Sequence, residues 1–335
     1  MPRPTLPTLA ALAALALGMS AIAARAEEIR LSLPADCEPG RTCWISKLVD
    51  RDPGERNIDY RCGARALGDH DGVDFAVPDM AAAAATRVLA AAPGRVLGVR
   101  DGMADVNILS IDAKTIAGRE CGNGVVIDHG NGWHTQYCHL RQGSIAVAQG
   151  QEVERGQELG RIGLSGSTEH PHVHLTVRRD GKPVDPFTGT GRDGTCGPEA
   201  DATALWQPEV KAALPYETRR LAVIGPAPGA ADKVAARAGD YGDTLAADAP
   251  ALVVWADVLA PRKGDRVRFR IRDADGEWVF DHTQTIESDH AQWFGFGGLR
   301  RKVPAWAAGD YGLEVNLLPV DGGAPLTAMR TIRVP

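Results

Sequence analysis

The sequence predicts an all-β protein of two domains, and three observations support this prediction. Residues 123–140 contain two strand-like runs around the turn Gly130-Asn131-Gly132. Residues 218–335 contain short alternating runs separated by Gly, Pro and Asp, as is typical of antiparallel strands. All six cysteines and seven of the nine histidines precede residue 197. A chain of 335 residues with 44% hydrophobic and 24% charged residues has the composition of a folded globular protein.

The first element is a secretory signal, which we predict over residues 1–26. Arg3 supplies the positive start, an apolar run follows from Leu9 to Ala23, and Ala24-Arg25-Ala26 has the small-x-small pattern of a cleavage site. The alternative is an uncleaved membrane anchor. Export with cleavage predicts a periplasmic or secreted protein that begins at Glu27 and has no membrane association afterwards.

The cysteines agree with export, because their number is even and none has CxxC spacing. We therefore expect disulfides and no cysteine ligands to zinc. The formal charge of the whole chain is −6, and loss of Arg3 and Arg25 with the signal makes it −8. This sign is opposite to the one that phosphate binding favours, so no nucleic-acid partner is expected.

A domain boundary is predicted where the composition changes. Pro198, Pro208 and Pro215 lie close together after the last cysteine. We expect a first domain over residues 27–197 with a disulfide-containing N-terminal extension, a linker over residues 198–217, and a second domain over residues 218–335. The alanines from Ala81 to Ala85 are expected to form a loop or a short helix.

The first domain contains a β-hairpin signature in the run GVVIDHGNGWHTQYCHL. Asn and Gly tolerate the positive φ that tight hairpin turns require. Pairing about this turn brings Cys121 nearly opposite Cys138, and cross-strand neighbours lie about 5 Å apart, within reach of a disulfide. The four remaining cysteines allow three pairings, between which the sequence does not choose: they are Cys37, Cys43, Cys62 and Cys196.

The histidines predict a metal site. The run HVHLTV reads as a strand, so His172 and His174 point to the same face. GDHDGVDFAV adds His70 and Asp74 four residues apart, and His139 ends the second hairpin strand. Two imidazoles and a carboxylate suffice for a catalytic zinc, and hydrolysis also needs a proton acceptor and a group that stabilises the oxyanion.

The motifs HDGVD, NGWHTQYCHL, GQEVERGQELGRIGLSG, HPHVHL and GKPVDPF, in this order, resemble the lysostaphin-type (LytM, M23 family) zinc endopeptidases over roughly residues 60–190. The resemblance implies a LytM-type antiparallel β-sheet peptidase domain that cuts peptide bonds in bacterial peptidoglycan. It also implies that Zn²⁺ is bound by His70, Asp74 and His174. His139 and His172 are then the two catalytic histidines without a metal bond, and which of them is the general base stays open.

Other residues are expected to contribute less. His129 and His134 flank the hairpin turn and are expected on the surface. Asp71 is expected to face solvent, and Asp185 to form a turn. His170 has two interpretations, a substrate-cleft residue or a neighbour that raises the local positive charge.

Two departures from the family pattern bear on substrate binding. Many members place a tyrosine shortly before the first ligand, whereas here the nearest tyrosine is Tyr60, so oxyanion assistance from a tyrosine is not expected. Residues 101–120 look like an insertion at the rim of the site, where substrate-contacting loops lie.

Two other functional classes compete with hydrolysis. Some relatives have lost the zinc ligands and act as regulators or activators of other cell-wall hydrolases, but all five positions are intact here. IAVAQGQEVERGQELGRIG also resembles the strands of biotinyl or lipoyl domains, but no lysine stands at a hairpin tip to carry the cofactor.

The second domain is expected to be an immunoglobulin-like β-sandwich without a catalytic site, since His282 and His290 are isolated. We interpret it as a module that positions the enzyme on its polymer or on a protein partner, or as a structural appendage. The expected substrate is a peptidoglycan peptide, and among its bonds we favour the D,D cross-link.

Overall fold

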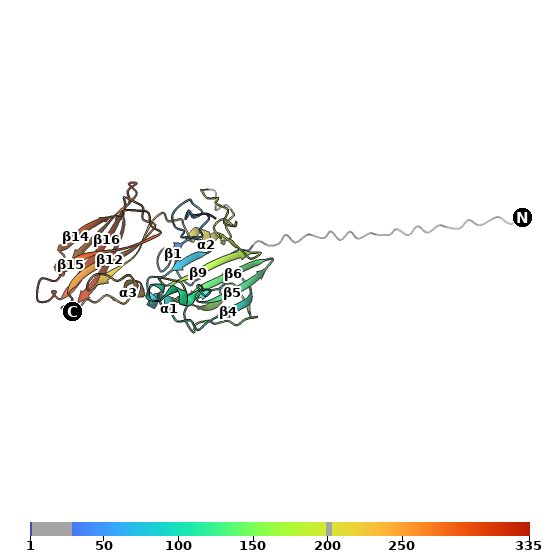
Figure 1. Ribbon diagram of the computed structural model, residues 1–335, viewed down its shortest axis with the longest axis horizontal. Coiled ribbons are helices and arrows are strands. Elements are labelled where there is room, and N and C mark those ends of the chain that lie inside the picture. The colour runs from blue at the N-terminus through green and yellow to red at the C-terminus, as the bar shows by residue number, and fades with distance from the viewer. Residues whose placement is uncertain (2–28, 199–202) are drawn as a thin grey trace.

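The computed structural model describes Met1, residues 29–198 and residues 203–335 (Figure 1). Apart from Met1, the predicted signal lies outside the described residues. The described part is mostly β, as predicted. Its three α-helices have six residues each, and no helix there is long and apolar enough to cross a membrane.

An eight-stranded antiparallel sheet forms the first half of the protein, in the order β1-β2-β9-β6-β5-β4-β7, with β10 paired to β9. Its strands are β1 (Trp44–Lys47), β2 (Val73–Ala76), β4 (Gly94–Arg100), β5 (Asn123–Gly130), β6 (Trp133–Leu140), β7 (Glu152–Val153), β9 (His172–Arg179) and β10 (Lys182–Val184). A separate pair consists of β3 (Arg87–Leu89) and β8 (Glu158–Arg161). The helical elements are α1 (Met80–Ala85), α2 (Pro208–Ala213) and two 3₁₀ turns at Ile108–Ser110 and Ala113–Ile116.

The predicted hairpin is confirmed as β5 and β6. Asn131 and Gly132 have φ of 51° and 79°, which is the left-handed pair that a tight turn between twisted strands requires. The Cys121–Cys138 disulfide is confirmed, and the remaining bridges are Cys37–Cys43 and Cys62–Cys196. The alanines Ala81 to Ala85 lie in α1, capped by the Asp79 side chain.

The eight-stranded sheet has one apolar and one polar face, because successive side chains of a strand point to opposite sides. Val73 and Phe75 of β2, Leu175 of β9 and Tyr137 of β6 are buried in the first hydrophobic core. The alternate positions therefore lie on the opposite face, where polar side chains are reachable from outside. The first core also includes Trp206 and Val210, so part of the predicted linker packs onto the first domain.

Two antiparallel sheets form the second half and share one hydrophobic core. One has the order β11-β12-β15 and the other β14-β13-β16-β17. Their strands are β11 (Arg220–Ala227), β12 (Ala251–Leu259), β13 (Arg266–Arg272), β14 (Trp278–Thr285), β15 (Gln292–Arg300), β16 (Gly309–Leu318) and β17 (Leu326–Val334). The narrower description as immunoglobulin-like stays a prediction, as do the domain boundaries.

The two halves lie side by side, and α3 (Lys233–Ala238) is on the side of the second half that faces α1 (Figure 1). Trp44, Ala76 and Leu259 are buried together between the halves. Glu169 bonds both Lys233 and Arg237 at 2.9 Å. These contacts fix the second half next to the open face of the large sheet.

Candidate metal centre

Two neighbouring strands of the large sheet, β2 and β9, carry the predicted metal ligands Asp74 and His174, and His70 lies in the loop before β2. In the register of β2 with β9, Asp74 lies directly opposite His174, and in that of β9 with β6, His174 lies opposite Cys138. Directly paired residues of an antiparallel sheet point to the same face. His172, two positions before His174, therefore shares this face, as the sequence predicts.

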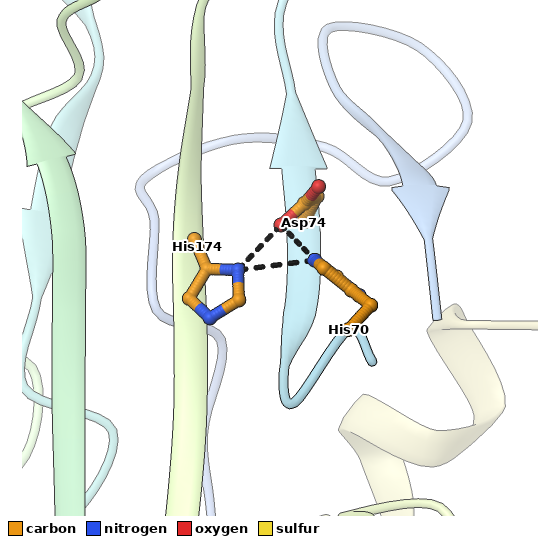
Figure 2. A group of neighbouring side chains, drawn as sticks. All are labelled: His70, Asp74 and His174. Carbon is orange, nitrogen blue, oxygen red and sulfur yellow. Dashed lines mark hydrogen bonds and ion pairs between the residues drawn. The ribbon is translucent and has the colours of Figure 1, made fainter. Parts of the chain in front are cut away.

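His70, Asp74 and His174 converge on one point (Figure 2). Oδ1 of Asp74 lies 3.0 Å from Nε2 of His70 and 2.9 Å from Nδ1 of His174, and the two ring nitrogens are 3.1 Å apart. The three potential ligand atoms lie within 4.8 Å of one another. The structure thus brings together the three residues that the sequence predicts as metal ligands.

Each ring of His70 and His174 has an inner nitrogen that points to Asp74 and an outer nitrogen that points away from it. The contacts of the outer nitrogens determine where the ring protons lie. Nδ1 of His70 lies 2.8 Å from the carbonyl oxygen of Leu48, to which only an N–H can donate. Nε2 of His174 lies 2.8 Å from Oγ1 of Thr176 and 3.2 Å from Oδ1 of Asp71. A proton on each outer nitrogen leaves a lone pair on each inner one, as in histidines that bind metals.

The donor set therefore fits a divalent cation. With the outer nitrogens protonated, two imidazole nitrogens and one oxygen of the Asp74 carboxylate meet at one point, and such a group needs positive charge there, from a metal ion or from a second proton on a ring. Two nitrogens and one oxygen are also a ligand set that catalytic zinc sites use, with a further position left for water or substrate.

The charges around Asp74 keep this carboxylate ionised. Burial alone would raise the pKa of Asp74, but the positive charges of His172 and His70 and the hydrogen bonds from His172 and His174 hold it well below its ordinary value. Burial would likewise lower the pKa of His174, but the hydrogen bonds to Asp71 and Asp74 raise it to about 9. The ionised Asp74 carboxylate thus favours a cation at this site, and without a metal His174 binds a second proton instead.

His139 and His172 lie beside this group, with ring centroids 4.7 Å apart. Nδ1 of His139 lies 2.8 Å from the carbonyl oxygen of Ser165, and Nδ1 of His172 lies 2.9 Å from that of His170. Both rings therefore hold a proton on Nδ1. Nε2 of His172 lies 3.4 Å from Oδ1 of Asp74, so the sequence-predicted pair borders the metal ligands.

The two histidines differ in what their Nε2 atoms contact. His172 faces a hydrogen-bond acceptor on each side, the His170 carbonyl oxygen and the Asp74 carboxylate. His139 makes its side-chain hydrogen bond through Nδ1 alone within the described residues. Burial and the charges of His172 and His174 lower the pKa of His139 well below its ordinary value. Its Nε2 is therefore a free base at neutral pH.

His139 also has an unusual backbone. Its φ is 63°, in the left-handed region that non-glycine residues seldom adopt. The N–H of His139 donates to the carbonyl oxygen of Cys121, and its own carbonyl oxygen accepts from Gly163. The disulfide between Cys121 and the preceding residue, Cys138, fixes the same stretch. These contacts aim the His139 ring into the site.

The prediction that Asp71 faces solvent is wrong. Its carboxylate contacts Nε2 of His174 and accepts from Arg178 at 2.8 Å, and its side chain is 32% exposed. Burial would raise the pKa of Asp71, but the hydrogen bond and charge of His174 and the charge of Arg178 lower it to about 2. The chain is not extended here, because it turns at Gly72 before β2 begins. In the sequence, Gly72 next to Asp71 is the one feature that indicates this turn.

Gly72 is required by close packing. A Cβ at this position would lie 2.5 Å from Nε2 of His174 and 2.6 Å from the carbonyl oxygen of Leu175, which are distances that real Cβ atoms do not reach. The glycine of HDGVD thus lets the loop approach strand β9 closely enough for Asp71 to reach His174.

The remaining histidines of the first domain lie outside the metal ligand set. His129 and His134 are partly buried on the hairpin and line no part of the pocket around the triad. His170 is buried and its ring stacks on that of His172 at 4.9 Å. Burial lowers the pKa of His170 well below its ordinary value, so it does not raise the local positive charge.

Tyr60 is buried and stacked on Phe187, so it does not reach the site. Asp185 makes a turn in which its carboxylate accepts from the Phe187 N–H, as expected. Of residues 101–120, Glu120 lines the pocket around the metal ligands, and two others hold the loop before His170. The Ile108 N–H and the Asn107 amide donate to the carbonyl oxygens of Thr168 and Glu169.

A pocket of about 590 Å³ surrounds the triad, which is the size range of small-ligand and peptide sites. Its lining adds polar groups to the five predicted residues: Lys47, Asp69, Asp71, Glu120, Gln136, Ser167, Thr176 and Arg178. The pocket is therefore polar and accessible to a peptide.

Comparisons with known proteins bear on the same region. The family model described as "Peptidase family M23" matches residues 68–186. Peptidoglycan DD-endopeptidase ShyA of Vibrio cholerae is 45% identical over 64 residues, which is 19% of this chain and 14% of the relative. DD-carboxypeptidase/endopeptidase Mpg of Neisseria meningitidis is 34% identical over 121 residues, which is 36% of this chain and 22% of the relative. The matches thus cover less than a quarter of either relative.

Among solved structures, the catalytic domain of a point mutant of the prophage-encoded M23 protein EnpA from Enterococcus faecalis is similar. Its sequence identity is 23% and its TM-score 0.32, over 46% of this chain and 95% of that one.

Proposed function

We propose that the protein is a zinc endopeptidase of the M23 family that hydrolyses peptide bonds in bacterial peptidoglycan, since residues 68–186 match the model of that family. The observation that carries the proposal is the convergence of five side chains in one pocket: His70, Asp74, His139, His172 and His174. The names of the relatives ShyA and Mpg support D,D cross-links as the bond that is cut.

His70, Asp74 and His174 would hold the zinc ion. When bound, zinc supplies Lewis-acid chemistry: it polarises a carbonyl and lowers the pKa of water to about 7. Asp71 and the Leu48 carbonyl oxygen fix the outer nitrogens of the ligand rings and so keep the inner lone pairs in place.

We assign the general base to His139 and the stabilisation of negative charge to His172. The free Nε2 of His139 accepts the proton of the attacking water, while the bond from its Nδ1 to Ser165 keeps the ring aimed. The Nε2–H of His172 donates to the oxygen on which negative charge develops as the carbonyl becomes tetrahedral. The proton on His139 then passes to the departing amine.

The location that supports this activity is outside the cytoplasm, because three disulfides join all six cysteines. We propose the periplasm or the cell exterior, reached by the predicted signal over residues 1–26. We also propose that the second domain positions the enzyme on its polymer or on a protein partner.

The test uses the mature chain, residues 27–335. Bound zinc is measured by elemental analysis, and soluble muropeptides are followed after incubation of wild type and His174→Ala with purified sacculi. We expect one zinc per chain and release that disappears in the variant. Zinc-free protein, or release unchanged in His174→Ala, would contradict the proposal.

A further inference from the structure

A second cleft lies between the two halves of the protein and has a volume of about 780 Å³. Ala64 and Leu67 line it from the first half, and Ala291, Trp293 and Phe294 line it from the second. Both domains therefore form the cleft together.

The cleft adjoins the pocket of the metal ligands. Lys47 lines both cavities, and its Nζ lies 3.9 Å from Oδ2 of Asp74. On the other side, His170 lines the cleft and its ring stacks on that of His172. A chain that leaves the metal centre past Lys47 thus enters the interdomain cleft directly.

The walls of the cleft are held in place by specific contacts. The Glu169 carboxylate bonds Lys233 and Arg237 of α3 at 2.9 Å, and Arg237 is itself fixed to Asp257 of β12 at 2.7 Å. Trp44 and Leu259 pack together at the domain junction. Because the cleft is preformed, a ligand would not have to bear the cost of ordering it.

The lining combines apolar rings with charged side chains of both signs, among them Lys47 at the entrance and Asp289 on the second domain. The rings of Trp293 and Phe294 offer partly exposed apolar surface, and Phe294 is supported from behind by Trp255 at 5.7 Å. Lys47 places a partly exposed ammonium group at the entrance, where it can pair with a carboxylate. Gln292 and His290 add hydrogen-bonding side chains on the second domain.

We propose that the substrate groove continues past Lys47 into the interdomain cleft, and that the cleft holds the carboxylate-bearing peptide arm on one side of the scissile bond. The β-sandwich half is then one wall of the substrate site. This inference rests on the proposed endopeptidase function. Contacts with a remote part of a substrate raise kcat/KM when their binding energy is used at the reacting bond.

The test compares two glycan-free substrates, a cross-linked peptide dimer with complete stem peptides and a truncated dimer that keeps only the residues flanking the scissile bond. Ala64→Trp and Ala291→Trp each fill the cleft from one wall without touching the five residues of the metal centre. Ala324→Trp, an exposed position on the second domain outside the cleft, is the matched control. Zinc content and circular dichroism verify that all variants fold.

We expect the ratio of kcat/KM for the complete dimer to that for the truncated dimer to fall about tenfold in both blocking variants and to stay unchanged in the control. A ratio that stays at the wild-type value in Ala64→Trp and Ala291→Trp would overturn this inference and leave the proposed function intact. If the wild type cuts neither dimer, the proposed function fails and this inference fails with it.

Discussion

Asp71 Oδ1 lies 3.2 Å from Nε2 of His174, on the side of the ring that faces away from the other metal ligands. The carboxylate thus determines which nitrogen of His174 holds the proton. Because the outer nitrogen is protonated, the inner one is free to bind a metal, so Asp71 acts on the metal site without being a ligand.

Replacing Asp71 tests this relationship. Asp71→Asn removes the charge that orients His174, and we expect zinc affinity to fall about 10- to 100-fold. Competition with a zinc chelator measures the change. Asp69→Asn, two residues earlier with a side chain that is 88% exposed, should bind zinc as the wild type does. Equal affinities in all three proteins would remove the orienting role.

Loss of His139, the proposed general base, should separate metal binding from catalysis. In His139→Ala we expect kcat to fall by about 10²- to 10⁴-fold while one zinc per chain remains bound. His134→Ala changes a histidine of the same strand that lies outside the pocket, and it should keep full activity. An active His139→Ala enzyme would shift the base assignment to His172.

Gly72 should not tolerate a side chain. In Gly72→Ala the new Cβ would lie 2.5 Å from Nε2 of His174, so either the loop or the ring must move. We expect zinc affinity to fall at least about tenfold, as for loss of an outer contact to a ligand. Gly68→Ala is the control, because its Cβ would meet its nearest neighbour at 4.0 Å. Chelator competition compares the two, and matching affinities would show that the loop has room.

The stability of the metal-free protein should fall in acid because of His170. Its folded pKa is lowered, so below about pH 6.5 the unfolded chain binds a proton that the folded chain does not. The free energy of unfolding then decreases as pH falls, by up to about 1.4 kcal/mol per pH unit for this group. Above pH 6.5 neither state binds this proton and the effect is absent.

Urea unfolding at pH 7.5 and 5.5, with a chelator present, measures that dependence. His170→Gln should show a smaller loss between the two pH values than the wild type. His282→Gln, an exposed position on the second domain, should lose as much as the wild type. An unchanged loss in His170→Gln would assign the acid sensitivity to other groups.

The two disulfides whose pairing the sequence left open should differ in their effect on stability. Cys62–Cys196 closes a loop with a sequence separation of 134 residues, and Cys37–Cys43 one of 6. The chain-entropy model gives about 5 kcal/mol for the first and about 2 kcal/mol for the second. Double Cys→Ser variants compared by denaturant unfolding measure both. A larger loss for the short loop would contradict the entropic account.

The features that follow from the sequence are those set by the alternation of side chains along a strand and by a turn between two strands. The Asn-Gly turn and the alternation of His172 and His174 follow from period-2 geometry, and they place the hairpin and the shared face of the two histidines. The Cys121–Cys138 bridge follows from the same hairpin, because its two ends are neighbours in register.

The features that do not follow from the sequence depend on contacts between distant segments of the folded chain. The sequence of β15 has no clean apolar alternation, because Gly295, Gly297 and Gly298 interrupt it, and the strand is defined by its pairing with β12. The contact of Asp71 with His174 depends on the bend of the chain at Gly72, whereas an extended chain would point Asp71 to solvent. The Cys62–Cys196 pair joins segments that only the folded chain brings together.

The sequence distance between the two strands of the metal centre has a consequence for the order of events during biosynthesis. His174 contacts Asp74 across 100 residues of chain, and β9 inserts between β2 and β6. A chain that crosses a membrane with its N-terminus first exposes His70 and Asp74 long before their third partner emerges. The complete ligand set therefore arises only when the centre of the sheet closes, so metal loading belongs to the last stage of folding.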